Sequence, residues 1–422
     1  MKEYLKRIVE SKIDDMLESS GAVLIEGPKW CGKTTTATLK AKSIVYMQDP
    51  LMKKQNKELA LVNPVLLLAG STPRLIDEWQ MVPSLWDAIR HEVDKRDELG
   101  QFILTGSSSP VKGDEITHSG IGRISRVLMR TMSLYESRDS IGTVSLRELF
   151  DGAAQVASTS SLDLLGIAFL ICRGGWPNTV DQKEKVALQQ AINYYDGLVN
   201  RDIFDSDGVP RNQDRLKRFL RSYARNIATQ ATIPTIKADM LFNDTSTLDE
   251  DTIASYLSVL KRMFVIEEMS AWNPNLRSQT TIRTGDTRYF IDPSIACASL
   301  GIGPNDLIND LKTFGLLFES LCVRDLRVYA QTLEGEVFHY RDRNGLECDA
   351  VIHLKNGKWG AIEVKLGPHQ FDEAANNLLK LKAQVNTDRM KDPSFLMILT
   401  GTPYAYQRED GVYVVPIGCL KN

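Results

Sequence analysis

The chain has 422 residues, of which 43% are hydrophobic and 25% charged, and its formal net charge is −3. This length predicts two to four domains, and the near-neutral charge excludes a basic field over the whole surface, so any nucleic-acid surface must be local. Six scattered cysteines without a C-x-x-C pair favour a reduced, cytoplasmic setting.

The first twenty residues place apolar side chains at helical spacing among many charges. This pattern predicts an amphipathic helix rather than a signal peptide. The longest apolar run, Leu164 to Cys172, is far shorter than the ~20 residues needed to span a bilayer. We therefore expect no membrane segment.

The most specific motif is a phosphate-binding loop at residues 27–34, which matches G-x-x-x-x-G-K-[ST] at every fixed position. An apolar run at 22–26 predicts a strand before it, and residues 34–40 predict a helix after it. Backbone N–H groups and the helix dipole then point at one anion site. We expect ATP there, with Lys33 on the β- and γ-phosphates and Thr34 on Mg²⁺. The expected nucleotide-binding residues are Gly27, Pro28, Lys29, Trp30, Cys31, Gly32, Lys33, Thr34 and Thr35.

Two adjacent carboxylates, Asp77 and Glu78, end the next apolar stretch. Asp77 at a strand end would hold Mg²⁺ through water, and Glu78 would activate the attacking water as a general base. A lone Asp-Glu pair often lies in a solvated turn, but its position downstream of a phosphate loop favours the catalytic interpretation.

A further predicted strand at 101–105 runs into a serine-rich turn, and Thr105 and Ser107 are candidates to sense the γ-phosphate; a plain turn explains each of them equally well. Runs at 43–47 and 127–132 complete five predicted strands. The repeated strand–helix spacing predicts an α/β fold with a parallel sheet, helices on both faces and the site at the carboxyl ends of the strands.

Stabilising the transferring phosphoryl group usually requires an arginine. Arg123 and Arg173 are the two candidates, with a slight preference for Arg123 as a catalytic residue, and either can instead form a structural ion pair. If the arginine comes from a neighbouring subunit, the protein must form a homo-oligomer to turn over.

These motifs occur in an order that resembles the prokaryotic AAA+-like P-loop ATPases with a C-terminal domain of unknown function, which are related to archaeal MNS and STAND-like ATPases. The resemblance extends over nearly the whole chain. It implies an AAA+-like ATPase domain at 1–150, a helical lid at 151–205, a winged-helix-like domain at 206–300 and a restriction-endonuclease-like domain at 301–422. The segments that carry it are Gly27 to Thr34, Leu75 to Glu78, Leu104 to Ser107, Gly122-Arg123, Met132 to Glu136 and Gly174 to Pro177.

The middle of the chain contains a helix with a basic face, opposite the apolar face formed by residues 216, 219, 220 and 223. Such a face can contact the phosphates of DNA, although a solvated face or salt bridges between subunits explain it equally well. The five arginines of this face are Arg211, Arg215, Arg218, Arg221 and Arg225.

A second helix, at 249–262, begins with three carboxylates, and residues 264–267 and 288–292 predict the two strands of a wing. Acidic residues at the start of this helix argue against sequence-specific DNA reading, because a recognition helix meets phosphates and bases there. A protein-docking winged helix is the better interpretation.

The C-terminal region predicts a hairpin with strands at 349–354 and 359–365. Glu363 and Lys365 share one face because they are two residues apart in a strand. A two-residue Asn-Gly turn would place Asp349 on the opposite face, whereas a three-residue loop at 355–357 pairs it with Glu363. We predict the three-residue loop, or a bulge with the same effect, with Glu347 beside the cluster.

Two carboxylates and a lysine on adjoining strands can bind Mg²⁺ and activate water for phosphodiester cleavage. The arrangement resembles the PD-(D/E)XK nucleases, although the proline before the aspartate is absent. The resemblance implies catalytic roles for Asp349, Glu363 and Lys365, with Asp349 and Glu363 as metal ligands, and it assigns Glu319 as the helical glutamate.

The sequence therefore predicts a Mg²⁺-dependent ATPase coupled to a nuclease-like domain that acts on DNA. The alternative is a nucleotide-dependent switch that docks proteins and carries a catalytically dead nuclease fold. A third, weaker possibility is a scaffold that binds ATP without turnover.

Overall fold

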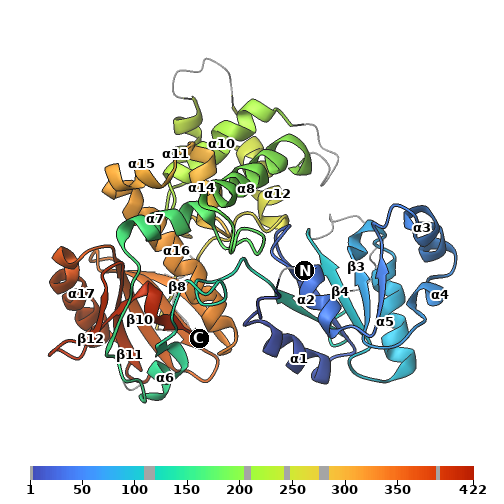
Figure 1. The fold of residues 1–422 in the computed structure, drawn as a ribbon, viewed down its shortest axis with the longest axis horizontal. Coiled ribbons are helices and arrows are strands. Elements are labelled where there is room, and N and C mark those ends of the chain that lie inside the picture. The colour runs from blue at the N-terminus through green and yellow to red at the C-terminus, as the bar shows by residue number, and fades with distance from the viewer. Residues whose placement is uncertain (1–2, 109–118, 204–210, 242–247, 275–284, 386–389) are drawn as a thin grey trace.

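The computed structural model describes residues 3–108, 119–203, 211–241, 248–274, 285–385 and 390–422. Figure 1 shows three parts: an α/β part at the N-terminal end, in blue and cyan; a helical part at the top; and a second α/β part, mainly orange and red. The long helix α16, Leu311–Gln331, lies where the helical part meets the second sheet.

The N-terminal part contains a five-stranded sheet in the order β2-β3-β4-β1-β5, in which every pair is parallel. The α/β fold with a parallel sheet is therefore confirmed. The fifth strand begins at Ile124 rather than at 127, because Ala22 at the start of β1 pairs with Ile124. The strands are β1 Ala22–Glu26, β2 Ser43–Tyr46, β3 Arg74–Asp77, β4 Phe102–Gly106 and β5 Ile124–Leu128.

Helices cover both faces of this sheet, as predicted. Alternate residues of β1 enter two different cores: Ala22 and Leu24 pack with Trp79 and Trp86, whereas Val23 packs on the other face with Ile13. The helices are α1 Glu10–Ser19, α2 Lys33–Lys40, α3 Lys53–Val62, α4 Pro64–Leu68, the 3₁₀ turn η1 Trp79–Met81, and α5 Leu85–Arg96.

The predicted helix over residues 1–20 begins only at Glu10. Its apolar residues before that point have other tertiary partners: Leu5 packs with Met132 and Val180 in a separate small core. Tertiary packing thus overrides the helical spacing in this segment.

The middle part is helical. Three helices, α10, α11 and α12, are followed by two antiparallel bridges, Ile266 with Phe290 and Met269 with Thr287, where the sequence predicted two wing strands. Single bridges replace those strands. The helices of this part are α7 Leu164–Arg173, α8 Glu184–Gly197, the π-helix η2 Leu198–Asp202, α10 Gln213–Arg225, α11 Ile233–Leu241, α12 Glu250–Arg262, α14 Pro293–Leu300 and α15 Pro304–Asn309.

The C-terminal part is a seven-stranded mixed sheet in the order β7-β12-β13-β11-β10-β9-β8, flanked by α16 and by α17, Phe371–Gln384. Short 3₁₀ turns lie at Pro368–Gln370 and Ile417–Cys419. The strands after α16 are β8 Gly335–Arg341, β9 Glu347–Leu354, β10 Trp359–Lys365, β11 Phe395–Thr400, β12 Tyr404–Gln407, β13 Tyr413–Pro416 and β14 Leu420–Lys421.

The expected domain boundary at 150/151 differs from the observed pairing. β6, Val144–Ser145, pairs with β14, and β7, Ser158–Thr159, pairs with β12, so residues 144–159 join the C-terminal part instead of ending the ATPase domain and starting a lid. The helix α6, Leu146–Asp151, lies between them beside the C-terminal sheet (Figure 1).

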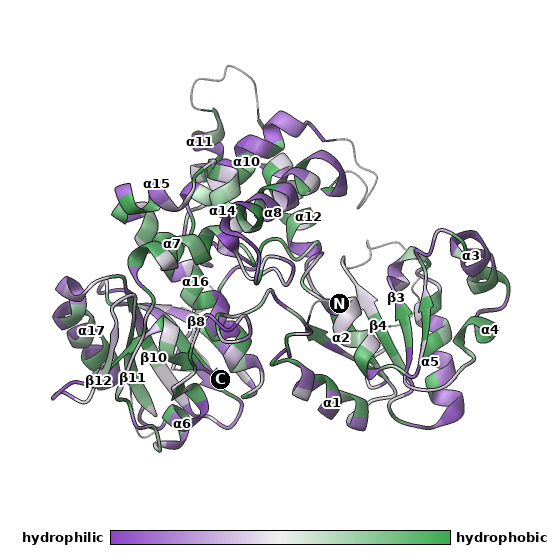
Figure 2. Ribbon diagram, viewed as in Figure 1, coloured by the Kyte–Doolittle hydropathy of each residue, from purple (hydrophilic) through white to green (hydrophobic). Residues whose placement is uncertain are grey.

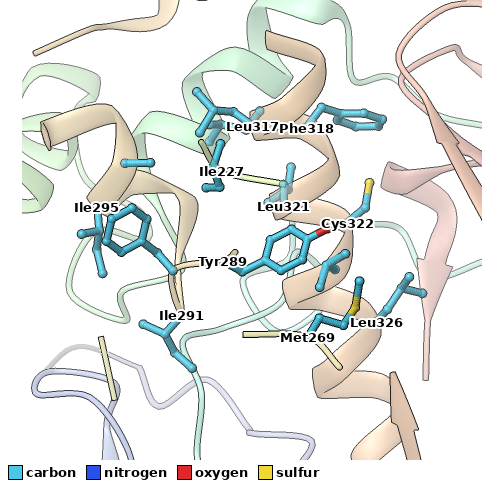
Figure 3. Close-up of a cluster of buried hydrophobic side chains, with 14 of the residues drawn as sticks. Ile227, Met269, Tyr289, Ile291, Ile295, Leu317, Phe318, Leu321, Cys322 and Leu326 are labelled. Atoms are coloured by element: carbon cyan, nitrogen blue, oxygen red, sulfur yellow. The ribbon is translucent and has the colours of Figure 1, made fainter. Parts of the chain in front are cut away.

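The largest core joins the helical part to the C-terminal sheet. Tyr289 from the bridge region packs among residues of α16 in this core, and Figure 3 shows its hydroxyl turned toward that helix. The central strands of both sheets are mostly apolar, whereas the surrounding helices carry hydrophilic stretches (Figure 2). All six cysteines are free and buried.

Candidate nucleotide and carboxylate sites

The phosphate loop connects β1 to α2, as the sequence predicted. Its two motif glycines have positive φ angles, 154° at Gly27 and 102° at Gly32, and a side chain at Gly27 would lie 2.2 Å from the Met129 carbonyl oxygen. Lys33 Nζ donates to the carbonyl oxygens of Gly27, at 2.9 Å, and Pro28, at 2.7 Å. The Lys33 side chain is therefore hydrogen-bonded to the backbone of the loop itself.

Three strand or helix ends meet beside the loop. Asp77 Oδ1 accepts hydrogen bonds from Thr34 Oγ1 and from Thr105 Oγ1, both at 2.7 Å. β4 lies between β1 and β3, which is why Thr105 reaches Asp77. Hard oxygen donors from Thr34 and Asp77 at one point fit a Mg²⁺ ion, which is commonly held by one or two protein oxygens together with phosphates and water.

Glu78, the candidate general base, directly follows β3 in the left-handed region, with φ 57° and ψ 48°. Its Oε2 atom accepts from Ser107 Oγ at 3.0 Å and from Gln80 Nε2, and its backbone N–H donates to Thr105 Oγ1 at 3.1 Å. Ser107 thus contacts the candidate base in this structure. Sequence reasoning missed Gln80, whose one visible signal is its position two residues after Glu78.

The outer residues of the loop contact the helical part. Lys29 Nζ forms an ion pair with Asp202 Oδ1 at 2.7 Å, and the half-exposed Trp30 ring lies edge-on to Tyr194 at 5.8 Å. Thr35 is exposed in the first turn of α2. The end of α8 and the π-helix η2 therefore adjoin the loop.

The two candidate arginines have different surroundings. Arg123 lies at the amino end of β5, where Ala22 N donates to its carbonyl, roughly 15 Å of strand away from the phosphate loop, and its Nε pairs with Asp94 Oδ1 at 2.8 Å. Arg123 therefore does not reach the loop of its own chain. Arg173 is buried and pairs with Asp139 Oδ2 at 2.6 Å, which matches the alternative that this arginine forms a structural ion pair.

The register of the C-terminal hairpin is the predicted one. Ile362 pairs with Ala350 and Trp359 with His353, so the loop spans residues 355–357 and Asp349 comes opposite Glu363. Lys365 Nζ contacts Glu363 Oε2 at 2.7 Å and Asp349 Oδ2 at 3.1 Å, and Val364 N donates to Asp349 Oδ2 at 2.7 Å.

The cluster contains three carboxylates, Glu319, Asp349 and Glu363, and one ammonium group, that of Lys365. Burial, and then the neighbouring Asp349 charge, raise the pKa of Glu363 to about 8, despite Lys365. Burial and Asp349 also raise the pKa of Glu319 well above its ordinary value, and Tyr289 OH donates to Glu319 Oε1 at 2.5 Å. Glu347, expected beside the cluster, is exposed and pairs with Arg341 at 3.2 Å.

Within the described residues, no group of three or more His, Cys, Asp or Glu side chains is arranged to hold a metal ion. Asp349 and Glu363 nevertheless converge on the Lys365 ammonium, which shows that a positive charge is favoured between them. Two carboxylates with water are a sufficient protein ligand set for Mg²⁺.

The basic face of α10 is present for four of the five predicted arginines, whereas Arg211 lies before the helix, which begins at Gln213. Leu216, Phe219 and Tyr223 are buried on one side, whereas Arg218 and Arg221 are exposed on the other. Two of the five predicted arginines contact neighbouring helices: Arg225 pairs with Asp239 at 2.7 Å, and Arg211 donates to Ser255 Oγ at 3.4 Å. None of the described helices is long and apolar enough to cross a membrane.

Comparison with known families divides the chain into three matches. Residues 19–137 match the family described as an AAA domain, residues 166–306 match a domain of unknown function (DUF8612), and residues 314–420 match another domain of unknown function (DUF4143).

Uncharacterized proteins of Mycobacterium tuberculosis and Mycobacterium bovis are each 23% identical over 85% of this chain and 74% of their own length. Among solved structures, a Walker-type ATPase of Pyrococcus abyssi covers 70% of this chain and 96% of its own at 14% identity, with a TM-score of 0.41. The Orc1 protein of Aeropyrum pernix, solved in complex with DNA, covers 74% and 95% at 13% identity, with a TM-score of 0.26. The AAA-domain match and the geometry of the phosphate loop together identify residues 19–137 as a P-loop ATPase domain.

Proposed function

We propose that this protein is a Mg²⁺-dependent ATPase whose turnover repositions a C-terminal nuclease-like domain that acts on DNA. The observation that carries the ATPase part is that the Thr34 and Thr105 hydroxyls both donate to Asp77 Oδ1 beside the phosphate loop, with Glu78 next in sequence. Lys33 binds the phosphates, and Thr34 and Asp77 hold Mg²⁺, which neutralises phosphate charge when bound. Glu78 accepts the proton of the attacking water.

Arg123 serves as the catalytic arginine in a neighbouring subunit of a homo-oligomer. Its distance from its own phosphate loop and its exposure, 47% of the side chain, support a role in trans. Arg123→Ala is expected to lower ATPase activity while leaving ATP binding intact, and adding a Glu78→Gln chain that keeps Arg123 would restore part of that activity in mixed oligomers.

The nuclease-like part rests on topology and on the carboxylate cluster. The order α16, β8, β9, β10, α17, β11, with Glu319, Asp349, Glu363 and Lys365 at one place, supports a restriction-endonuclease-like domain. The alternative is a nucleotide-dependent protein-docking switch with a dead nuclease fold. Glu250 and Asp251 in the first turn of α12 favour this alternative, because they repel DNA from that helix.

The first experiment measures ATP hydrolysis and nucleic-acid cleavage on the same preparations. Glu78→Gln should bind ATP but lose most hydrolysis, since removing a general base costs about 10² to 10⁴ in rate. Metal-dependent cleavage of duplex DNA, single-stranded DNA or RNA by wild type, lost in Asp349→Ala, would establish the nuclease. ATP hydrolysis without cleavage of any substrate would favour the docking switch.

A further inference from the structure

Arg7 lies directly beside the phosphate loop although it precedes the loop by more than one secondary-structure element. Its side chain is only 4% exposed. The guanidinium donates in three directions: Nη1 to the Cys31 carbonyl at 2.7 Å, Nη2 to the Arg130 carbonyl at 2.9 Å, and Nε to Glu136 Oε1 at 3.1 Å. Arg7 therefore joins the loop to the chain that leaves β5.

Glu136 anchors this arginine. Its side chain is 1% exposed, and it also accepts hydrogen bonds from the backbone N–H groups of Ile8, at 2.7 Å, and Ser133, at 2.8 Å. These backbone donors fix the carboxylate independently of Arg7. A buried charge held by several donors is a rigid partner, and Arg7 is held in place by it.

The carbonyl groups of a phosphate loop must point away from the bound anion so that its N–H groups can face it. In this structure Gly27 and Pro28 direct their carbonyls at Lys33, and Cys31 directs its carbonyl at Arg7. A bound nucleotide draws Lys33 toward its phosphates and away from those carbonyls. Arg7 stays in place, because Glu136 holds it.

We propose that Arg7 is a positioning residue of the nucleotide site, which keeps the Cys31 end of the phosphate loop in its anion-binding shape while Lys33 is engaged by the nucleotide. The proposal rests on the proposed function only in that ATP binds at this loop. Arg7 is buried and acts on the loop through the Cys31 carbonyl, so its loss should weaken binding more than it slows the chemical step.

Arg7→Lys tests this role, because lysine keeps a charge for Glu136 but cannot donate along three fixed directions at once. The matched control is Arg327→Lys: Arg327 is also buried, donates to the Glu267 and Glu268 carbonyls, and pairs with Glu267, but it lies on α16. We expect Arg7→Lys to raise the Kd of a fluorescent ATP analogue about tenfold or more, because the variant loses one hydrogen bond from a charged group. Its kcat at saturating ATP should stay within about threefold, and Arg327→Lys should leave the Kd unchanged.

Equal affinity of wild type and Arg7→Lys for ATP would show that Arg7 is structural only. Failure of the wild type to bind ATP would instead overturn the nucleotide site itself. If Arg7→Lys does not fold, Glu136→Gln decides: it removes the charge that holds Arg7, so it should also raise the Kd of the ATP analogue, and an unchanged Kd would contradict the proposal.

Discussion

Glu78 shows how a single residue is prepared for chemistry. A non-glycine residue in the left-handed region costs roughly 1 kcal/mol or more, and such residues concentrate at active sites. The turn directs its carboxylate to Ser107 and Gln80 just after β3 ends. The strain at Glu78 is therefore the cost of directing the carboxylate of the proposed general base to this point at the end of the strand.

Ser107→Ala should lower kcat for ATP hydrolysis about tenfold with little change in KM, because the hydroxyl donates to Glu78 Oε2 at 3.0 Å and fixes the carboxylate. Steady-state ATPase kinetics measure this directly. Ser108→Ala, one residue farther along the same turn, is the matched control and should behave as wild type. Equal loss in both variants would mean that the turn, and not the hydroxyl, matters.

At the scale of elements, the sequence predicted what local patterns determine. The motif spacing of the phosphate loop requires glycine geometry and a following helix, and both are present. The register of β9 and β10 follows from side-chain alternation and the loop at 355–357. The phosphate loop and the hairpin register each depend on residues that are close together in the chain, which is why the sequence alone could predict them.

Long-range partners could not be predicted in this way. Arg7 and Glu136 are 129 residues apart, and although Glu136 ends a segment that carries the resemblance, no spacing rule connects that segment to Arg7. β6 and β7 are two residues each, too short to show alternation, and their partners come near the end of the chain. The start of β5 at Ile124 is likewise set by its pairing with β1 rather than by its own hydrophobicity.

The basic face of α10 carries a prediction at the element scale. If it contacts DNA phosphates, Arg221→Ala should weaken binding by a similar factor on all sequences and reduce the slope of log K against log salt by about 1. Fluorescence anisotropy between low and moderate salt measures the slope. Lys312→Ala, at an exposed position at the start of α16, is the control. The same slope in wild type and Arg221→Ala would show that this face does not contact DNA.

Across the whole molecule, Glu267 joins three parts. Arg130, which follows β5, approaches its Oε1 at 2.5 Å, and Arg327 of α16 lies 3.6 Å from its Oε2. Burial opposes the charge of Glu267, but the two arginines outweigh it and lower the pKa of Glu267 from 4.5 to about 2. The carboxylate therefore stabilises the folded state above pH 4.5, and this contribution is lost as the pH falls from 4.5 toward 2.

Glu267→Gln should accordingly lower the free energy of unfolding by about 2 to 3 kcal/mol at pH 7, and the difference from wild type should shrink between pH 4.5 and pH 3. Thermal unfolding at both ends of this range measures it. Glu336→Gln, an exposed glutamate beside the same interface, should have little effect at either pH. A difference for Glu267→Gln that does not depend on pH would contradict the ionic explanation.

The pairing of β7 with β12 has a consequence for biosynthesis. A ribosome that adds about 5 to 20 residues per second makes β7 roughly 12 to 50 s before Tyr404 of its partner strand emerges. The five strands of the ATPase sheet are all synthesised before β7, so that sheet can assemble while the segment after it still awaits its partner. A nascent chain arrested in this interval would present an assembled phosphate loop and an unpaired β7, and unpaired strand edges make a nascent chain prone to aggregation.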